Sequence, residues 1–276
     1  MNVRSIHAKP WLVAGAVAAV FAATTAIEAR ADATCTTLSP GQGNTLQLTD
    51  DYDAGSGHIC LVIDSLNSTL DLNGHTIRRT GFGMGTGAAI RCSAAGVRII
   101  DTGSPKGGIE GLWQTGIEDC EGIEALEIVN AGINEGIVND DHGLEELRDS
   151  VISVAQFAVT VDLKRRGSTI TNNYVEALST GIHVTDMNDE SGSGKALIDR
   201  NVIRRASFRA ILVENTSLTK VQDNLMYQRN PSDFPGTSDC VELASGNVHN
   251  RLLCDCPGAN DEFCEGDEPP MLLTLF

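Results

Sequence analysis

The stretch STLDLNGHTI, residues 68–77, decides how the chain folds. Apolar and polar residues alternate through Leu70, as in a half-buried strand, until the pair Asn73-Gly74 interrupts the alternation and Ile77 resumes it. A two-residue turn between strand-like stretches is typical of a β-hairpin. It is equally typical of the corner of a coil, and in that case the same pattern has to recur further along the chain.

The pattern recurs in three later stretches, each with an asparagine three residues after an apolar residue. These stretches are ITNNYV (170–175), IDRNVI (198–203) and VQDNLM (221–226), and residues 147–152 form a variant with serine. The aligned residues are Ser150, Asn173, Asn201 and Asn224, at offsets of 23, 28 and 23 residues. Asparagine adopts the left-handed backbone angles of tight corners and bonds to neighbouring amides. We therefore expect Asn173, Asn201 and Asn224 to form a structural ladder.

A second repeat consists of apolar anchor residues, each starting a short alternating stretch. The anchors are Ile90, Ile117, Ile137, Val159, Ile182 and Ile211, at offsets of 27, 20, 22, 23 and 29 residues. Offsets of this size are typical of units that stack into solenoids. Leucine-rich repeats are the structural alternative, but they need LxxLxL spacing, whereas this chain is β-branched where they require leucine. The sequence therefore predicts short parallel strands with Val, Ile and Leu facing inward.

With these motifs the chain resembles right-handed parallel β-helix proteins of the pectin-lyase-like superfold, and within it the periplasmic NosD-like β-helix repeat family. In that family, segments such as LDLNGHTI begin the first coils. The resemblance covers roughly residues 58–245 and implies an all-β, single-stranded right-handed parallel β-helix, or solenoid. With aromatic residues at 4%, its core has to be aliphatic. The superfold hosts lyases, glycosidases, epimerases, esterases and plain binding proteins, so the fold does not specify the function.

The first 31 residues have the features of a secretory signal peptide. Basic residues precede an apolar run over residues 11–26, and ARADATC offers small residues for cleavage after Ala31 or Ala33. An uncleaved membrane anchor is the alternative. Because no second apolar run of about 18 residues follows, we expect a secreted or periplasmic mature chain without a membrane span.

Four segments are expected along the chain. They are a signal peptide (1–31), an N-terminal cap (32–57), the parallel β-helix (58–245) and a Cys-rich C-terminal cap or tail (246–276). Cleavage leaves about 245 residues, 276 minus 31, and 20 to 29 residues per coil give about eight coils. Open solenoid ends expose unpaired backbone, which is why caps are expected, although a disordered end is the alternative for the last residues.

The chain is acidic, with a formal net charge of -17 at pH 7. Such a charge repels nucleic acid and anionic lipid, so we expect neither as a partner. It attracts divalent cations, or it serves only to keep the protein soluble. We expect a monomer.

All eight cysteines follow the predicted cleavage site, and an even count in an exported chain indicates disulfides. Paired CxxC spacing is missing, which argues against zinc. Sequence proximity suggests Cys35 with Cys60 and Cys92 with Cys120. It leaves Cys240, Cys254, Cys256 and Cys264 to pair among themselves.

The strand register gathers polar side chains on one outward face. Taking the anchors as inward, the residues one, three and five positions further on belong to the outward face, and neighbouring coils lie about 4.8 Å apart. The candidate catalytic residues on this patch are Asp140, His142, Asp162, Lys164 and His183. The candidate substrate-binding residues are Arg165 and Glu214.

Two kinds of chemistry suit this patch, and a third interpretation needs none. Two carboxylates one coil apart raise the pKa of one of them and create a general acid, near the separation of about 5 Å that retaining glycosidases use. A histidine or lysine base would instead serve a polysaccharide lyase or epimerase, which removes a proton beside a uronate carboxylate. Charged residues on a solvent face also simply keep a β-helix soluble.

Family motifs are incomplete in this chain. NDDHG (139–143) superficially resembles the Asp-Asp and Gly-His-Gly elements of polygalacturonases, which lie on separate coils, and KRR (164–166) stands in place of their RIK element. The acidic, Gly-rich stretch DMNDESGSG (186–194) makes calcium the candidate ion, with an exposed insertion as the alternative, and no cofactor is established. The sequence predicts an exported protein that binds polysaccharide or provides a non-catalytic envelope surface. The alternative is a carbohydrate-active enzyme, a lyase or glycoside hydrolase.

Overall fold

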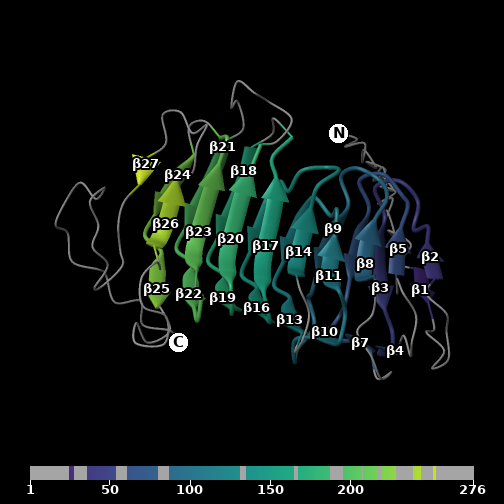
Figure 1. The fold of residues 1–276 in the computed structure, drawn as a ribbon. Coiled ribbons are helices and arrows are strands. Elements are labelled where there is room, and N and C mark those ends of the chain that lie inside the picture. Colours follow the sequence, from purple (N-terminus) through teal and green to yellow (C-terminus); the bar gives the residue numbers. More distant parts are fainter. Residues whose placement is uncertain are drawn as a thin grey trace, which may run out of the picture.

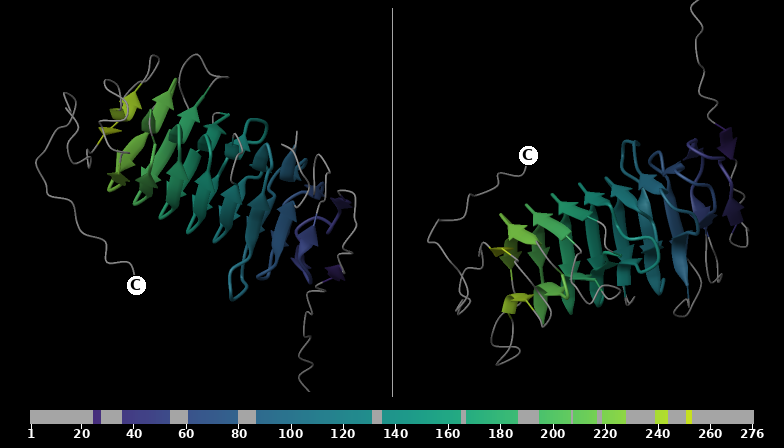
Figure 2. Two further views of the ribbon diagram at one scale, coloured as in Figure 1. Left: turned by 60° about the horizontal axis from the view of Figure 1, so that its bottom comes forward. Right: turned by 90° about the horizontal axis from the view of Figure 1, so that it is seen from above.

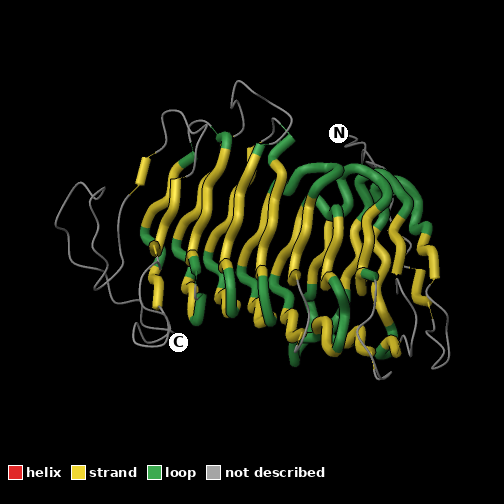
Figure 3. The backbone as a smooth tube through the Cα atoms, in the orientation of Figure 1, coloured by secondary structure: helices red, strands yellow, loops and turns green. Residues whose placement is uncertain are grey.

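Short strands and turns make up the described chain, and they wind into a right-handed parallel β-helix (Figure 1, Figure 3). The computed structural model describes residues 36–53, 61–79, 87–130, 135–164, 167–186, 195–206, 208–216 and 219–227, and the backbone of strands at 25–27, 239–243 and 251–252. These residues contain no helix. The all-β class predicted from the sequence is confirmed.

Each coil passes through three parallel sheets, which we call B, A and C in the order in which the chain visits them. Sheet B contains β2 (Thr36–Leu38), β5 (Leu61–Ile63), β8 (Ala88–Cys92), β11 (Thr115–Glu118), β14 (Glu135–Asn139), β17 (Phe157–Asp162), β20 (Thr180–Thr185), β23 (Arg209–Glu214) and β26 (Asp239–Leu243). Sheet A contains β1 (Thr25–Ile27), β3 (Thr45–Leu48), β6 (Thr69–Asp71), β9 (Arg98–Ile100), β12 (Gly122–Glu124), β15 (Glu146–Arg148), β18 (Gly167–Thr171), β21 (Lys195–Asp199), β24 (Lys220–Gln222) and β27 (Arg251–Leu252). Sheet C contains β4 (Tyr52–Asp53), β7 (Thr76–Arg79), β10 (Gly108–Gly111), β13 (Glu127–Asn130), β16 (Val151–Val154), β19 (Tyr174–Ala177), β22 (Val202–Arg204) and β25 (Leu225–Tyr227).

Within the described residues, β2 to β25 form eight successive coils of three strands, which stack through about seven turns. Each strand inside a sheet pairs in parallel with the strands one coil before and one coil after it, so the coils lie side by side along one axis (Figure 2). A section of three strands per coil differs from a leucine-rich repeat, which has a single strand per unit. The solenoid predicted from the repeats is therefore confirmed.

Three stacks of inward aliphatic side chains fill the solenoid. In sheet B the stack is Leu61, Ile90, Ile117, Ile137, Val159, Ile182 and Ile211. In sheet A it is Leu46, Leu70, Ile99, Ile123, Leu147, Ile170, Ile198 and Val221. In sheet C it includes Ile77, Ile109, Ile128, Ile152, Val175 and Ile203. Each buried aliphatic side chain contributes roughly 1.5 to 3 kcal/mol, so these stacks supply most of the driving force.

The asparagine ladder lies at the corner between sheets A and C. Asn201 Oδ1 accepts hydrogen bonds from the backbone N–H of Asn173 at 3.0 Å and from Asn173 Nδ2 at 2.9 Å. Asn224 Oδ1 accepts the two equivalent bonds from Asn201, both at 2.9 Å. Ser150 begins the ladder, because its backbone N–H donates to Asn173 Oδ1 at 3.0 Å. All of these side chains are buried, so the ladder satisfies amides that water cannot reach.

The expected left-handed backbone of the ladder residues is wrong by one position. Positive φ angles fall on the preceding, exposed or half-exposed corner residues, which include Asp149 (54°), Asn172 (57°), Arg200 (52°) and Asp223 (53°). The turn therefore divides the two functions that the sequence had assigned to one asparagine. The first residue makes the bend, and the second turns its amide inward to bond between coils.

STLDLNGHTI is a coil corner and not a hairpin, because β6 and β7 belong to different sheets. Asn73 and Gly74 both have positive φ, at 50° and 83°. Asp71 Oδ1 accepts the backbone N–H of Asn73 at 2.9 Å, and Asp101 Oδ1 accepts that of Gly74 at 2.8 Å. Carboxylates thus hold this corner where asparagines hold the later ones.

The carboxylate of Asp71 joins three coils. Its Oδ2 accepts hydrogen bonds from Gln47 Nε2 at 2.9 Å on the preceding coil and from Thr102 Oγ1 at 2.6 Å on the following one. Burial disfavours the charged form, but the hydrogen bonds from Thr102, Gln47 and Asn73 outweigh it and lower the pKa of Asp71. The ionised carboxylate is therefore part of the folded structure.

A disulfide links two neighbouring coils near the middle of the described chain. Cys92 at the end of β8 bonds to Cys120 after β11, with a Cα–Cα distance of 5.0 Å and a sequence separation of 28 residues. This confirms one of the predicted pairs. The pair Cys35 and Cys60, and the late cysteines Cys254, Cys256 and Cys264, lie outside the described residues, and only the backbone of Cys240 in β26 is described.

Coil strands also occur in the segments predicted as leader, cap and tail. β1 lies within residues 1–31 and pairs with β3, β2 to β4 lie within residues 32–57, and β27 lies within residues 246–276. The described chain contains no helix with the length and hydropathy needed to span a membrane.

Candidate functional site

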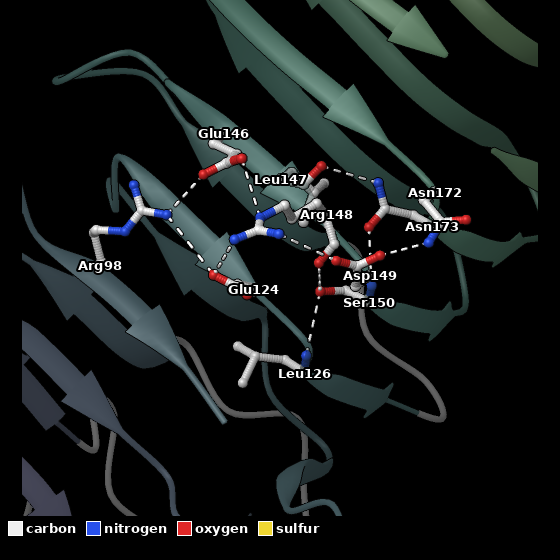
Figure 4. A network of polar contacts seen from close by, with 10 residues as sticks. All are labelled: Arg98, Glu124, Leu126, Glu146, Leu147, Arg148, Asp149, Ser150, Asn172 and Asn173. Atoms are coloured by element: carbon white, nitrogen blue, oxygen red, sulfur yellow. Dashed lines mark hydrogen bonds and ion pairs between the residues drawn. The ribbon is translucent and has the colours of Figure 1, made fainter. Parts of the chain in front are cut away.

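The outward face of sheet A carries charges of both signs that neutralise one another (Figure 4). Arg98 lies 2.7 Å from Glu146, and Arg148 lies 2.8 Å from Glu124 and 3.1 Å from Glu146. These four side chains come from β9, β12 and β15, one coil after another. We attribute to this network a modest stabilising role, as half-exposed ion pairs have.

Sheet B presents the outward rows that the sequence predicted. One row, across β14, β17, β20 and β23, contains Val138, Thr160, His183 and Leu212. The next outward row contains Asp162, Thr185 and Glu214. Several predicted site residues therefore share one face, at the ends of adjacent strands.

Four aspartates and a lysine form an acidic corner where sheet B turns into sheet A. The backbone N–H groups of Asp140 and Asp141 each donate to Asp119 Oδ1 at 3.0 Å. Lys164 Nζ lies 2.9 Å from Asp162 Oδ2. The structure thus brings Asp140, Asp162 and Lys164 together, and it adds Asp119, which the sequence argument missed because it lies one coil earlier.

Electrostatics in the acidic corner favour some chemical roles over others. Burial, Asp119 and Asp162 raise the pKa of Asp140, and Lys164 partly opposes them. The hydrogen bond to Asp162 raises the pKa of Lys164, with further contributions from Asp140 and Asp141. A lysine whose pKa is raised keeps its proton at neutral pH, which disfavours Lys164 as a general base.

The remaining predicted residues lie elsewhere on sheet B, in the turn after β14 or outside the described chain. His183 Nε2 is 2.7 Å from Glu214 Oε2 on the next coil, so these two residues contact each other. His142 is half buried in the turn that follows β14. Arg165 lies outside the described residues.

An open depression of about 330 Å³ lies on the outward face of sheet B, over the first residues of its strands. The residues that line it include Glu135, Phe157, Thr160, His183, Phe208 and Arg209. Phe208 is 53% exposed and Phe157 is half buried, so aromatic surface faces solvent here. Of these lining residues, only His183 was predicted from the sequence as a site residue. The available signal was Phe157 and Phe208, which lie at or directly before the first residue of a strand in a chain with 4% aromatic residues.

Glu135 lines the depression and is also affected by the charge of Asp140 in the acidic corner. Burial, followed by the charges of Asp140 and Glu118, raises its pKa. Glu118 itself is held by Arg91, whose Nε and terminal nitrogen donate to the two carboxylate oxygens at 2.7 and 2.8 Å. No described residue forms a hydrogen bond or an ion pair with the carboxylate of Glu135.

Replacing Glu135 with glutamine is expected to raise the melting temperature at pH 7 by about 1 to 3 °C. The pKa of Glu135 is higher in the folded than in the unfolded state, so its charge destabilises the folded state at neutral pH. That cost disappears as the pH falls through the folded pKa toward the ordinary value of 4.5. The gain of the variant should therefore shrink over the same interval in thermal melts followed by circular dichroism.

The matched control is Glu127→Gln, which removes an exposed carboxylate from β13 on sheet C. It should leave the melting temperature unchanged both at pH 7 and after the pH has fallen through the folded pKa of Glu135. An equal gain in both variants would show that the effect comes from net charge and not from the surroundings of Glu135.

Metal ligation has little support in the described part of the chain, where no three His, Cys, Asp or Glu residues are grouped as a metal site. Of the acidic stretch 186–194, the candidate calcium loop, the structure describes only Asp186, which is buried.

The comparisons with known proteins give no match. No family model, curated protein or solved structure is similar to this chain at the significance required.

Proposed function

We propose that this is an exported β-helix protein that binds a saccharide chain on the outward face of sheet B without cleaving it. The depression supports this proposal, because Phe157 and Phe208 offer apolar ring faces beside hydrogen-bonding side chains. Sugar rings have apolar faces that stack on aromatic side chains, and their hydroxyl groups need polar partners at the rim. Thr160 and His183 provide such partners.

The shape of the depression also fits an extended ligand. Its lining residues come from β14, β17, β20 and β23, which are consecutive strands of sheet B, and from the residues directly before β20 and β23. Neighbouring strands are about 4.8 Å apart, so these four strands span about 14 Å along the solenoid. The strands are fixed by their neighbours on both sides, so little ordering entropy is lost on binding.

Contacts among the predicted catalytic groups favour binding over catalysis. Asp162 pairs with Lys164, and His183 pairs with Glu214. A general base needs a free acceptor close to the proton that it removes. The Asp162–Lys164 and His183–Glu214 pairs leave polar groups on the outward face of sheet B, which suits the binding of a saccharide.

The replacement Phe157→Ala is expected to weaken saccharide binding roughly tenfold, because it removes a stacking surface worth about 1 to 2 kcal/mol. A glycan array identifies the ligand, and isothermal titration calorimetry measures the dissociation constant of the wild type and the variant. Phe208→Ala should weaken binding in the same direction.

Leu66→Ala serves as the control for these two variants. Leu66 is 51% exposed and lies in the turn after β5, away from the residues that line the depression. Its replacement should leave affinity unchanged. Wild-type affinity in both phenylalanine variants would place the ligand elsewhere or refute saccharide binding.

A carbohydrate-active enzyme is the second candidate, favoured by the raised pKa of Asp140 beside Asp162. A carboxyl group that keeps its proton at higher pH is suited to act as a general acid. Multiple turnovers on a saccharide would replace the binding proposal by this one. Turnover that is unaffected by Asp162→Asn would then remove this residue from the mechanism.

Export and relationship to the NosD-like or pectin-lyase-like proteins belong to the same proposal. Export is supported by the signal-peptide features of residues 1–31 and by the Cys92–Cys120 disulfide, since disulfides persist outside the reducing cytosol. The relationship is supported by the LDLNGHTI segment, the parallel coils and the asparagine ladder.

A further inference from the structure

The depression has a negative end. Glu135 lines it and aligns with Phe157 on the next coil, so a carboxylate and an aromatic ring stand side by side on adjacent strands. The same row continues through Thr180 to Arg209. Arg209 is thus three strands away from Glu135, about 14 Å at the usual strand spacing.

The cations near Glu135 are held by other carboxylates. Arg91 forms a two-pronged contact with Glu118, and Lys164 pairs with Asp162. In the described part of the chain, Glu135 has neither an ion pair nor a hydrogen bond through its carboxylate. A half-buried carboxylate in such a place attracts a cation, and the charges of Asp140 and Glu118 strengthen the attraction.

We infer that the depression selects a positively charged sugar, an amino sugar whose ammonium group pairs with Glu135 while its ring rests on Phe157. This inference rests on the proposed saccharide binding and adds the chemical class of the saccharide. An ammonium group donates up to three hydrogen bonds and also gains energy over an aromatic face. Glu135 and Phe157 supply both partners from neighbouring strands.

The same charges disfavour a uronate. A sugar carboxylate in this part of the depression would face Glu135, with Asp140 and Glu118 close enough to affect the pKa of Glu135. Like charges brought together in an interface oppose binding. The expected order of affinity is therefore amino sugar first, its neutral N-acetylated counterpart second and the uronate last.

Calorimetric titration of the full mature chain with three tetrasaccharides tests this order. The ligands are a glucosamine tetramer at a pH where its amines are protonated, the N-acetylglucosamine tetramer and a galacturonate tetramer. We expect the glucosamine tetramer to bind roughly tenfold more tightly than the N-acetylated one, the value of one charge-assisted hydrogen bond. Glu135→Gln should abolish this difference by weakening the binding of the glucosamine tetramer.

Two control variants separate a specific site from general attraction to an acidic protein. Glu127→Gln, on sheet C, should keep the preference, whereas Phe157→Ala should weaken binding of both the glucosamine and the N-acetylated tetramers. Glucosamine binding that neither Glu135→Gln nor Phe157→Ala changes would overturn the inference.

The remaining outcomes distinguish the inference from the function beneath it. Equal affinity for the charged and neutral tetramers, or tightest binding of the galacturonate, would overturn charge selection while saccharide binding stands. Failure of all three tetramers, and of every ligand on a glycan array, would overturn both.

Discussion

Replacing Asn201 with alanine is expected to lower the free energy of unfolding by about 4 kcal/mol. Asn201 Oδ1 accepts two bonds from Asn173, and its Nδ2 donates to the backbone oxygen of Ile170 at 2.9 Å. The replacement leaves these groups buried without partners, and each such group costs about 1 to 3 kcal/mol. Urea unfolding followed by circular dichroism measures the loss.

The neighbouring corner residue provides a matched control for Asn201→Ala. Asn172 is also an asparagine, but it is exposed, has a φ of 57° and hydrogen-bonds to the exposed side chain of Asp149. Glycine tolerates that backbone angle, so Asn172→Gly should cost less than about 1 kcal/mol. Equal losses in the two variants would contradict the assignment of the ladder to the buried position.

The replacement Gly103→Ala should destabilise the protein by about 3 kcal/mol, the second-largest effect that we expect. A Cβ atom on Gly103 would lie 2.0 Å from the backbone nitrogen of Gly74 and 2.4 Å from the carbonyl carbon of Asn73. Both obstacles are backbone atoms of the corner in STLDLNGHTI, so no side-chain rotation relieves the clash. Either the corner or the turn after β9 has to move, and hydrogen bonds to Asp101 are lost with it.

Gly167 gives the control, because a Cβ atom there meets no atom within 4 Å. Gly167→Ala should be neutral or stabilising by a few tenths of a kcal/mol, since alanine loses less backbone entropy on folding. Thermal melts of the two variants should therefore differ by several degrees. Similar melting temperatures would show that the coils of Gly74 and Gly103 are less tightly packed than the short distance from a Cβ atom on Gly103 to Gly74 indicates.

The fold could be predicted because the repeat is set by local chemistry. Ile137, Val159 and Ile182 align across strands as their spacing requires, and a solenoid allows each coil only its neighbours as partners. The bend at each ladder corner was assigned one residue too late. The error arose because asparagine suits both a left-handed backbone angle and a buried amide that bonds between coils. In the structure the left-handed angle belongs to the residue before each ladder asparagine, and at two corners this residue is Arg200 or Asp223.

For the candidate site, the sequence predicts which residues share the outward face but not which side chains contact one another. Alternation along the strands places His183 beside Thr160 and Asp162 on the same outward face. It does not predict that His183 contacts Glu214 or that Lys164 contacts Asp162, since these contacts depend on side-chain rotamers. The depression was missed because it is formed by the different sizes of outward side chains on four strands, which no single repeat displays.

Along the solenoid, the side chains that accept backbone N–H groups at the corners between sheets A and C change from the carboxylates of Asp71 and Asp101 to the amides of the asparagine ladder. The hydrogen bonds that lower the pKa of Asp71 stabilise the early coils fully above its ordinary value of 3.8, and this support is lost as the pH falls through the folded pKa. The amides of Asn173, Asn201 and Asn224 take up no proton over that range. We therefore expect acid to loosen the coils around Asp71 before the coils that the asparagine ladder joins.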